Sequence, residues 1–134
     1  MLRDIDVPKV TDVAVAIACE VDELGGENYY AYLINLKNES LENILIRSNG
    51  YGVLEDNRYE TTELRRFYDD MEAKSFIKIE PVLADALKLS NQYWVSFYVD
   101  KVLYDRKYVF VPGSVEPANF ITLPLIEEQG VMIK

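Results

Sequence analysis

The fold is decided by residues 92–111, which read QYWVSFYVDKVLYDRKYVFV. Apolar and polar side chains alternate here with a period of two, which is typical of half-buried β-strands. The first predicted strand has one face of Tyr93, Val95, Phe97 and Val99 and an opposite face of Trp94, Ser96 and Tyr98. Asp100-Lys101 then predicts the tip of a hairpin that returns through residues 102–111.

Strand-like alternation continues outward from this hairpin in both directions. The further apolar runs lie at residues 10–21, 29–38, 41–55, 75–82, 119–126 and 130–133. Turn-forming residues separate the runs roughly every 8–15 residues, and strands do not alternate with helical segments. The sequence therefore predicts an all-β fold with a single antiparallel β-sandwich of the immunoglobulin/fibronectin-III-like kind. We expect seven or eight strands, at most one or two short helices, and one domain over residues 1–134.

Residues 61–72, which read TTELRRFYDDME, allow two interpretations. Leu64, either Phe67 or Tyr68, and Met71 lie at helical spacing, and Thr61 or Thr62 is a suitable residue to cap a helix there. An irregular edge segment fits the same residues equally well, so both interpretations stay open. Residues 83–90 favour a single helical turn.

The composition excludes several kinds of active site. The 134 residues contain no histidine and one cysteine. These residues therefore cannot form a Ser-His-Asp triad, an imidazole zinc site, a thiolate metal cage or an internal disulfide. The spaced Asp-x-Asp-x-Asp-Gly loop of a calcium site is also missing. We expect no metal and no cofactor.

Charge and hydropathy argue against two classes of partner. A net charge of −9 repels nucleic acid, and the nearest approach to a basic cluster, Arg65-Arg66, is flanked by acidic residues. The longest apolar stretch, residues 13–19, is much shorter than the ~20 residues that span a membrane. The first residues also lack the pattern of a secretory signal. We expect a soluble, cytoplasmic protein with neither nucleic acid nor membrane as a partner.

Carboxylates offer the remaining route to catalysis. The candidate pairs are Glu20/Asp22, Asp69/Asp70, Asp100/Asp105 and Glu127/Glu128. A glycosidase needs two carboxyl groups ~5–10 Å apart across a cleft, whereas 23 acidic residues produce such pairs in turns by chance. The glycine-containing segment 48–52 lacks the spacing of a phosphate-binding loop and is typical of a bulge or a close backbone approach. We therefore expect no enzyme activity.

Aromatic side chains give the best indication of a binding surface, since the chain has ten tyrosines. Neighbouring side chains of a strand face opposite sides, so Tyr29 points outward if Tyr30 and Tyr32 pack inside. Trp94 and Tyr98 likewise lie opposite the apolar face of their strand. Exposed aromatic side chains mark protein- or sugar-binding surfaces. Tyr29, Trp94 and Tyr98 are thus the candidate interaction residues, and the alternative is that a helix or the C-terminal tail covers them.

Parts of the sequence resemble known proteins. The run Tyr32-x-Ile34-x-Leu36-x-Asn38, the run Leu41-x-x-Ile44-x-Ile46, and the segments 75–79 and 93–98 resemble fibronectin-type-III-like and ApaG-like sandwiches. The whole chain resembles a group of small bacterial proteins with DVPKV near the start, YWVSF in the middle and a PLIEEQGVM-like tail. Some members of that group carry the name phenylalanyl-tRNA synthetase α subunit. Class II synthetase motifs need arginines on a strand–loop–strand and a Gly-Arg helix, and no such arrangement can be read in this acidic chain.

These observations predict a non-catalytic interaction or accessory module with an unidentified protein partner. Homodimerisation through an edge strand or through the aromatic face is one form of this prediction. The alternative is a carbohydrate- or small-ligand-binding domain, which rests on the same aromatic side chains and the nearby acids. A carboxylate-based hydrolase and an aminoacyl-tRNA synthetase-related piece have less support.

Overall fold

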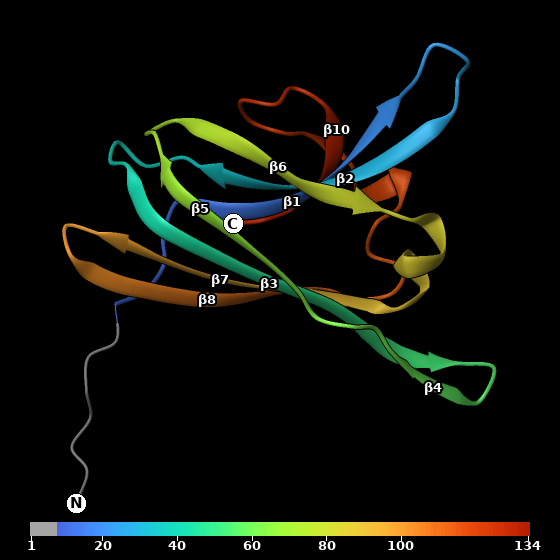
Figure 1. Cartoon of the computed structure of the whole chain (residues 1–134). Helices are drawn as coiled ribbons and strands as arrows, with labels where there is room; N and C mark the ends of the chain where they lie inside the picture. Colours follow the sequence, from blue (N-terminus) through green and yellow to red (C-terminus); the bar gives the residue numbers. More distant parts are fainter. Residues whose placement is uncertain (1–7) are drawn as a thin grey trace, which may run out of the picture.

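Two antiparallel β-sheets stack face to face in the computed structural model, which describes residues 8–134 (Figure 1). The first sheet has the strand order β6-β2-β1-β10-β9. Its strands are β1 (Val13–Val21), β2 (Glu27–Asn35), β6 (Ser75–Val82), β9 (Ile121–Thr122) and β10 (Gln129–Ile133). The second sheet has the order β4-β3-β7-β8, and β5 also pairs with β3. Its strands are β3 (Leu41–Leu54), β4 (Asn57–Glu60), β5 (Leu64–Met71), β7 (Ser90–Val99) and β8 (Val102–Phe110). The predicted all-β sandwich is confirmed.

The hairpin predicted at residues 92–111 is also confirmed. Strands β7 and β8 pair without interruption from Asn91 and Phe110 to Val99 and Val102. Asp100 and Lys101 between them have φ values of +48° and +66°. Positive φ at both central residues gives a two-residue turn whose twist matches that of the flanking strands.

Two details differ from the prediction. Ten strands occur in residues 8–134, rather than seven or eight, because the additional β4 and β9 are short pieces of 4 and 2 residues. Most of the ambiguous segment 61–72 forms β5. This strand pairs with β3, which provides hydrogen-bond partners for its backbone N–H and C=O groups. Its helical spacing is coincidental, since Tyr68 packs on the core and Phe67 faces solvent.

The short helices are the 3₁₀ turns η1 (Ala84–Lys88) and η2 (Pro117–Asn119).

The main core lies between the two sheets. Its fully buried side chains come from both sheets and include Val13, Val15, Ile17, Leu33, Ile44, Ile46, Val95 and Phe97. The Tyr108 hydroxyl donates a hydrogen bond of 2.5 Å to the carbonyl of Val13 and so joins β8 to β1. Burial raises the pKa of Tyr108 to about 12. The hydroxyl thus stays protonated and bonded throughout the neutral range.

A second, smaller core covers the outer side of the first sheet. Ala14, Ala16 and Ala18 of β1 lie there beneath the buried side chain of Leu123. The segment between β9 and β10 arches over this side of the sheet (Figure 1). Strand β10 approaches β1 closely at Gly130, where a Cβ atom would clash with the carbonyl oxygen of Ile17 and lie 2.9 Å from the Cα of Ala18. Strand β1 is therefore buried on both of its faces.

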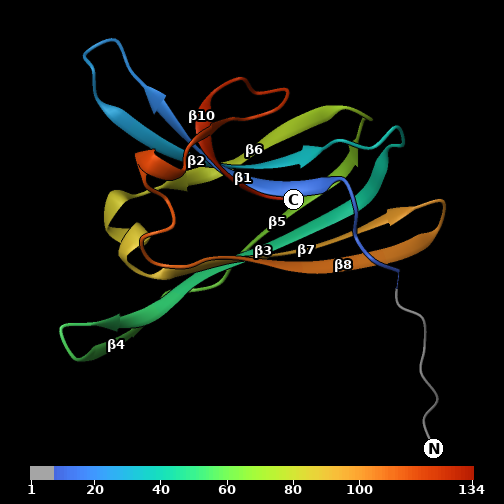
Figure 2. The same cartoon turned by 180° about the vertical axis from the view of Figure 1, so that it is seen from behind.

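Two hairpins extend beyond the stacked sheets at the same end of the molecule (Figures 1 and 2). One joins β1 to β2 and carries Leu24 at its tip, with 98% of its surface exposed. The other joins β3 to β4 and carries Val53, which is 63% exposed. Both tips are well exposed and provide control positions for surface experiments.

Candidate interaction surface

The outward side of β5, β3, β7 and β8 forms one continuous surface, which we call the open face. The cross-strand pairing aligns its side chains in three rows. The basic row consists of Arg65, Arg47, Trp94 and Lys107, the middle row of Phe67, Leu45, Ser96 and Asp105, and the acidic row of Asp70, Glu42, Tyr98 and Leu103. Along β7 and β8 successive rows are two residues apart, which corresponds to about 7 Å.

A β-bulge keeps β3 in phase with this arrangement. The pairing of β3 with β7 shifts between Glu42 and Leu45. Asn43 lies at this shift with a φ of +48° and is the additional residue of the bulge, which has no partner of its own on β7. Without the bulge, Glu42 and Leu45 would face opposite sides of the sheet. The bulge therefore places the acidic row on the same surface as the other two rows.

Apolar side chains are exposed on the open face. Phe67 is 60% exposed, Leu103 is 50% exposed, and Tyr98 is 36% exposed. Leu45 and Trp94 lie between them on β3 and β7 and are half-buried. Contiguous apolar side chains with a polar border are typical of protein-binding surfaces.

The Trp94 ring is held in place by its neighbours. Its indole nitrogen donates a hydrogen bond to Asp105, whose same oxygen also accepts one of 2.9 Å from the Ser96 hydroxyl. The guanidinium of Arg47 lies 4.9 Å from the ring centroid, and the ammonium of Lys107 lies 5.7 Å from it. Such cation–π contacts contribute ~0.5–1 kcal/mol each at exposed sites. Trp94 is therefore a fixed anchor within the basic row.

The charges of the open face are separated along the strands. Arg65 and Arg47 share the carboxylate of Glu63 at 3.4 and 3.8 Å, which leaves the basic row with an excess of cations. At the other end, Glu42 and Asp70 line one surface hollow together with Glu72. The open face thus has a basic end and an acidic end, although the whole chain carries a charge of −9.

Of the three predicted interaction residues, Trp94 and Tyr98 lie on the open face and Tyr29 does not. Tyr29 is half-buried and packs against the main core, whereas Tyr30 and Tyr32 belong to the smaller core under the C-terminal segment. The expected orientation of Tyr29 is thus wrong, because the inward side of β2 carries the smaller Ala31 and Leu33. The alternative, in which a helix or the tail covers these residues, does not hold for Trp94 and Tyr98, because the tail packs on the outer side of β1 in the other sheet.

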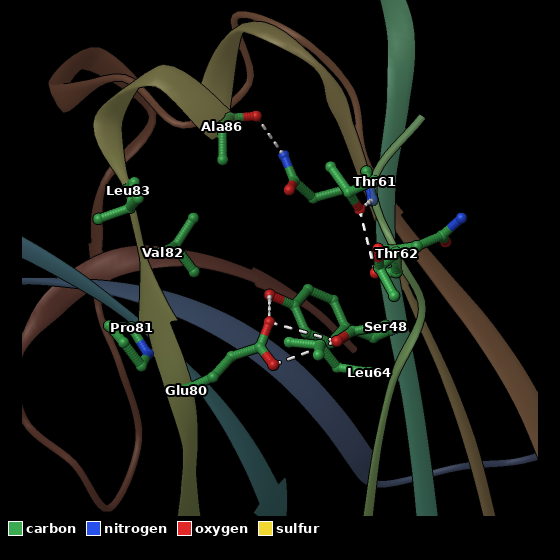
Figure 3. A pocket seen from close by; sticks show the side chains of 13 residues that line it. Ser48, Thr61, Thr62, Leu64, Glu80, Pro81, Val82, Leu83 and Ala86 are labelled. Atoms are coloured by element: carbon green, nitrogen blue, oxygen red, sulfur yellow. Dashed lines mark hydrogen bonds between the residues drawn. The ribbon is translucent and has the colours of Figure 1, made fainter. Parts of the chain in front are cut away.

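A cleft at one edge of the sandwich is the second candidate site (Figure 3). It has a volume of about 160 Å³ and runs between β6 and the start of β5. Glu80 points into it from β6 and accepts hydrogen bonds from the Ser48 hydroxyl at 3.1 Å and the Tyr93 hydroxyl at 3.2 Å. The guanidinium of Arg66 lies 3.5 Å from the same carboxylate. Glu80 is thus bonded to side chains of the opposite sheet.

The cleft has no second carboxylate among its lining residues. Burial raises the pKa of Tyr93 well above its usual range, and the neighbouring Glu80 carboxylate raises it further. Tyr93 is therefore a hydrogen-bond donor to Glu80 rather than a base. The two-carboxylate geometry of a glycosidase is missing from this cleft.

The described part of the chain offers neither a metal site nor a membrane span. Between residues 8 and 134, acidic and cysteine side chains form no group of three suited to hold a metal ion. No helix of these residues has the length and apolar character needed to cross a bilayer.

Comparison with known proteins gives no family for this chain. Neither a scan against models of protein families nor a search of curated proteins found a match. The function must therefore be inferred from the surfaces described above.

Proposed function

We propose that this protein is a non-catalytic interaction module that binds another protein through its open face. One observation carries the proposal. The outer side of β1, at the centre of the first sheet, is covered by the chain's own C-terminal segment, whereas the open face has no covering segment within residues 8–134. Leaving Phe67, Tyr98 and Leu103 in water forfeits part of the ~1.5–3 kcal/mol that burial of each side chain provides. A bound partner recovers this free energy.

The charges of the open face define the chemistry of that partner. The basic row offers Arg47, Arg65 and Lys107 beside the fixed Trp94 ring. A complementary partner presents apolar side chains for the middle row and carboxylates for the basic row. Tryptophan and arginine are the residue types that most often dominate the free energy of protein association. We therefore expect Trp94 and Arg47 to contribute most to binding.

Site-specific photo-crosslinking tests this proposal. A photoreactive phenylalanine analogue replaces Phe67 on the open face or, as a matched control, Val53 on the projecting hairpin, which is similarly exposed. Irradiation in the native host is expected to give a protein adduct from position 67 that Trp94→Ala greatly weakens. Equal adducts from both positions, or an adduct that Trp94→Ala leaves unchanged, would contradict the proposal.

Strand order supports a more specific classification of the fold, and the single cysteine supports a cytoplasmic location. Strands β6, β2 and β1 face β3, β7 and β8, which is how immunoglobulin-like domains divide their strands between two sheets. We include the fibronectin-III-like type in the proposal on this basis. The one cysteine, Cys19, is buried and free, which suits the reducing conditions of the cytoplasm.

The cleft at Glu80 favours a second candidate function, the binding of a small polar ligand. Thr61 and Thr62 border the cleft opposite Pro81 and Leu83, so polar and apolar groups converge there (Figure 3). A thermal-shift screen of sugars and amines tests it. A ligand at 100 times its Kd adds ~2.7 kcal/mol to stability, and Glu80→Gln would abolish the shift. A screen without any stabilising compound would exclude this function for the compounds used.

A further inference from the structure

We infer that the open face binds a second copy of this chain about a two-fold axis that runs along the middle row. The inference rests on the proposed function and specifies its partner. In such a dimer the basic row of each copy lies on the acidic row of the other copy. The observation that carries it is the order of the three rows, which makes the open face complementary to itself.

The geometry of face-to-face sheets allows two directions for the axis. A two-fold axis that relates two stacked faces lies in the plane between them, because it must reverse the direction in which each face points. An axis parallel to the strands places every row on itself with the order of the strands reversed. If it runs between β3 and β7, Arg65 meets Lys107 and Arg47 meets Trp94 of the second copy. An axis across the strands exchanges the rows on either side of it. Only the second direction brings opposite charges together.

The register of the strands then fixes the contacts. Each strand lies over the same strand of the second copy, so residues of the basic and acidic rows meet along β5 and β3. Arg65 meets Asp70 of the second copy, and Arg47 meets Glu42. Along β7, Ser96 lies midway between Trp94 and Tyr98, so the two aromatic rings meet each other across the axis.

The remaining contacts are apolar or screened. Leu45 and Phe67 lie on the axis and pack against their own counterparts. Lys107 extends its aliphatic stem over Leu103 of the second copy. Asp105 is the one residue that meets a like charge. It is exposed on the edge strand β8, where water and salt screen its charge, and it already accepts hydrogen bonds from Trp94 and Ser96.

The size of the open face sets the strength of association. Four strands spaced ~4.8 Å apart and about five residues of ~3.4 Å each cover on the order of 300–400 Å² per copy. Interfaces that bury less than ~1,200 Å² in total belong to weak and transient complexes. We therefore expect a dissociation constant on the order of 100 μM, raised by salt because the charged contacts lie at the border of the interface.

Charge reversal in two complementary variants tests the axis. Arg47→Glu places a new carboxylate against Glu42 of the second copy, and Glu42→Arg places a new guanidinium against Arg47. Each variant alone is expected to dimerise at least about tenfold more weakly than the wild type. In an equimolar mixture, however, both contacts of the mixed dimer join opposite charges. Sedimentation equilibrium should therefore show that the mixture regains the wild-type dissociation constant.

Controls distinguish weaker dimerisation from misfolding of the variants, and failure of the dimer from failure of the proposed function. Circular dichroism confirms that both variants fold, and Lys88→Glu, an exposed reversal on η1 away from the open face, should leave dimerisation unchanged. Variants that dimerise like the wild type, or a mixture no tighter than its components, would overturn the proposed axis. A wild-type chain that stays monomeric at millimolar concentration would overturn the dimer itself. A Trp94-dependent adduct with a different protein at position 67 would then still support the proposed function.

Discussion

Truncation of one leucine on each outer face measures how differently the two sheets are covered. Leu123 has no exposed surface and lies over the three alanines of β1, whereas Leu103 is 50% exposed on the open face. Leu→Ala at a buried site costs ~2–5 kcal/mol of stability, partly because a cavity remains. The C-terminal segment can collapse partly onto the small alanines, so we expect about 3 kcal/mol for Leu123→Ala. For Leu103→Ala we expect about 0.5 kcal/mol.

Urea denaturation followed by circular dichroism measures both losses. The protein concentration should be low micromolar, so that association through the open face does not stabilise the wild type. The slope of the transition should be the same in the three proteins, because the same surface is exposed on unfolding. Equal losses for the two variants would refute the conclusion that the chain covers one outer face and leaves the other to a partner.

Three further predictions concern the packing that supports this arrangement. Gly130→Ala should cost about 2 kcal/mol or more, since the added Cβ would clash with the backbone of β1; a thermal midpoint equal to the wild type would contradict this. Asn35→Ala should cost ~2–4 kcal/mol, because the buried Asn35 amide donates to the carbonyls of Glu39 and Glu72, each at 2.9 Å. Chemical denaturation measures that cost, and a loss below ~1 kcal/mol would show that water replaces these bonds. Burial raises the pKa of Tyr108 from 10.0 to about 12, so its contribution to stability is present below pH 10 and is lost as the pH rises through 12. Tyr108→Phe should therefore reduce the fall in stability over this interval by about 3 kcal/mol, and a fall that this variant leaves unchanged would contradict the assignment; the remaining fall belongs to other buried tyrosines such as Tyr93.

The sandwich could be predicted from the sequence because period-two alternation is a local signal. Asp100-Lys101 interrupts two alternating runs and forms the predicted hairpin turn. Residues 61–72 carry no such signal, because β5 is exposed on both of its sides from Leu64 to Phe67. Its partner β3 also lies about 20 residues away in sequence. Pairing between distant strands decides the structure of that segment.

The open face could be predicted only in part. Alternation places Trp94 and Tyr98 on one side of their strand, and the structure leaves that side outward. The sequence does not reveal that Phe67 and Leu103 lie on the same surface, although Leu103 has the phase of the outward residues of β8. A strictly alternating pattern assigns Glu42 and Leu45 to opposite sides of β3, because it does not include the bulge at Asn43. The acidic row therefore cannot be predicted from alternation.

The error at Tyr29 has a different physical origin. Large aromatic side chains are expected to point to the main core, but β1 and β2 are covered on both sides. Tyr30 and Tyr32 therefore pack beneath the C-terminal segment, where Lys78 lies 3.8 Å from the Tyr30 ring. A sequence pattern cannot tell which face of a doubly covered strand is the inner one.

Concentration-dependent NMR chemical shifts of the backbone amides test the central claim most directly. As the protein is concentrated from low micromolar to millimolar, we expect shifts at residues of β3, β5, β7 and β8, largest near Arg47 and Trp94 and reduced by salt. Shifts gathered instead at the two projecting hairpins or under the C-terminal segment would show that another surface mediates association.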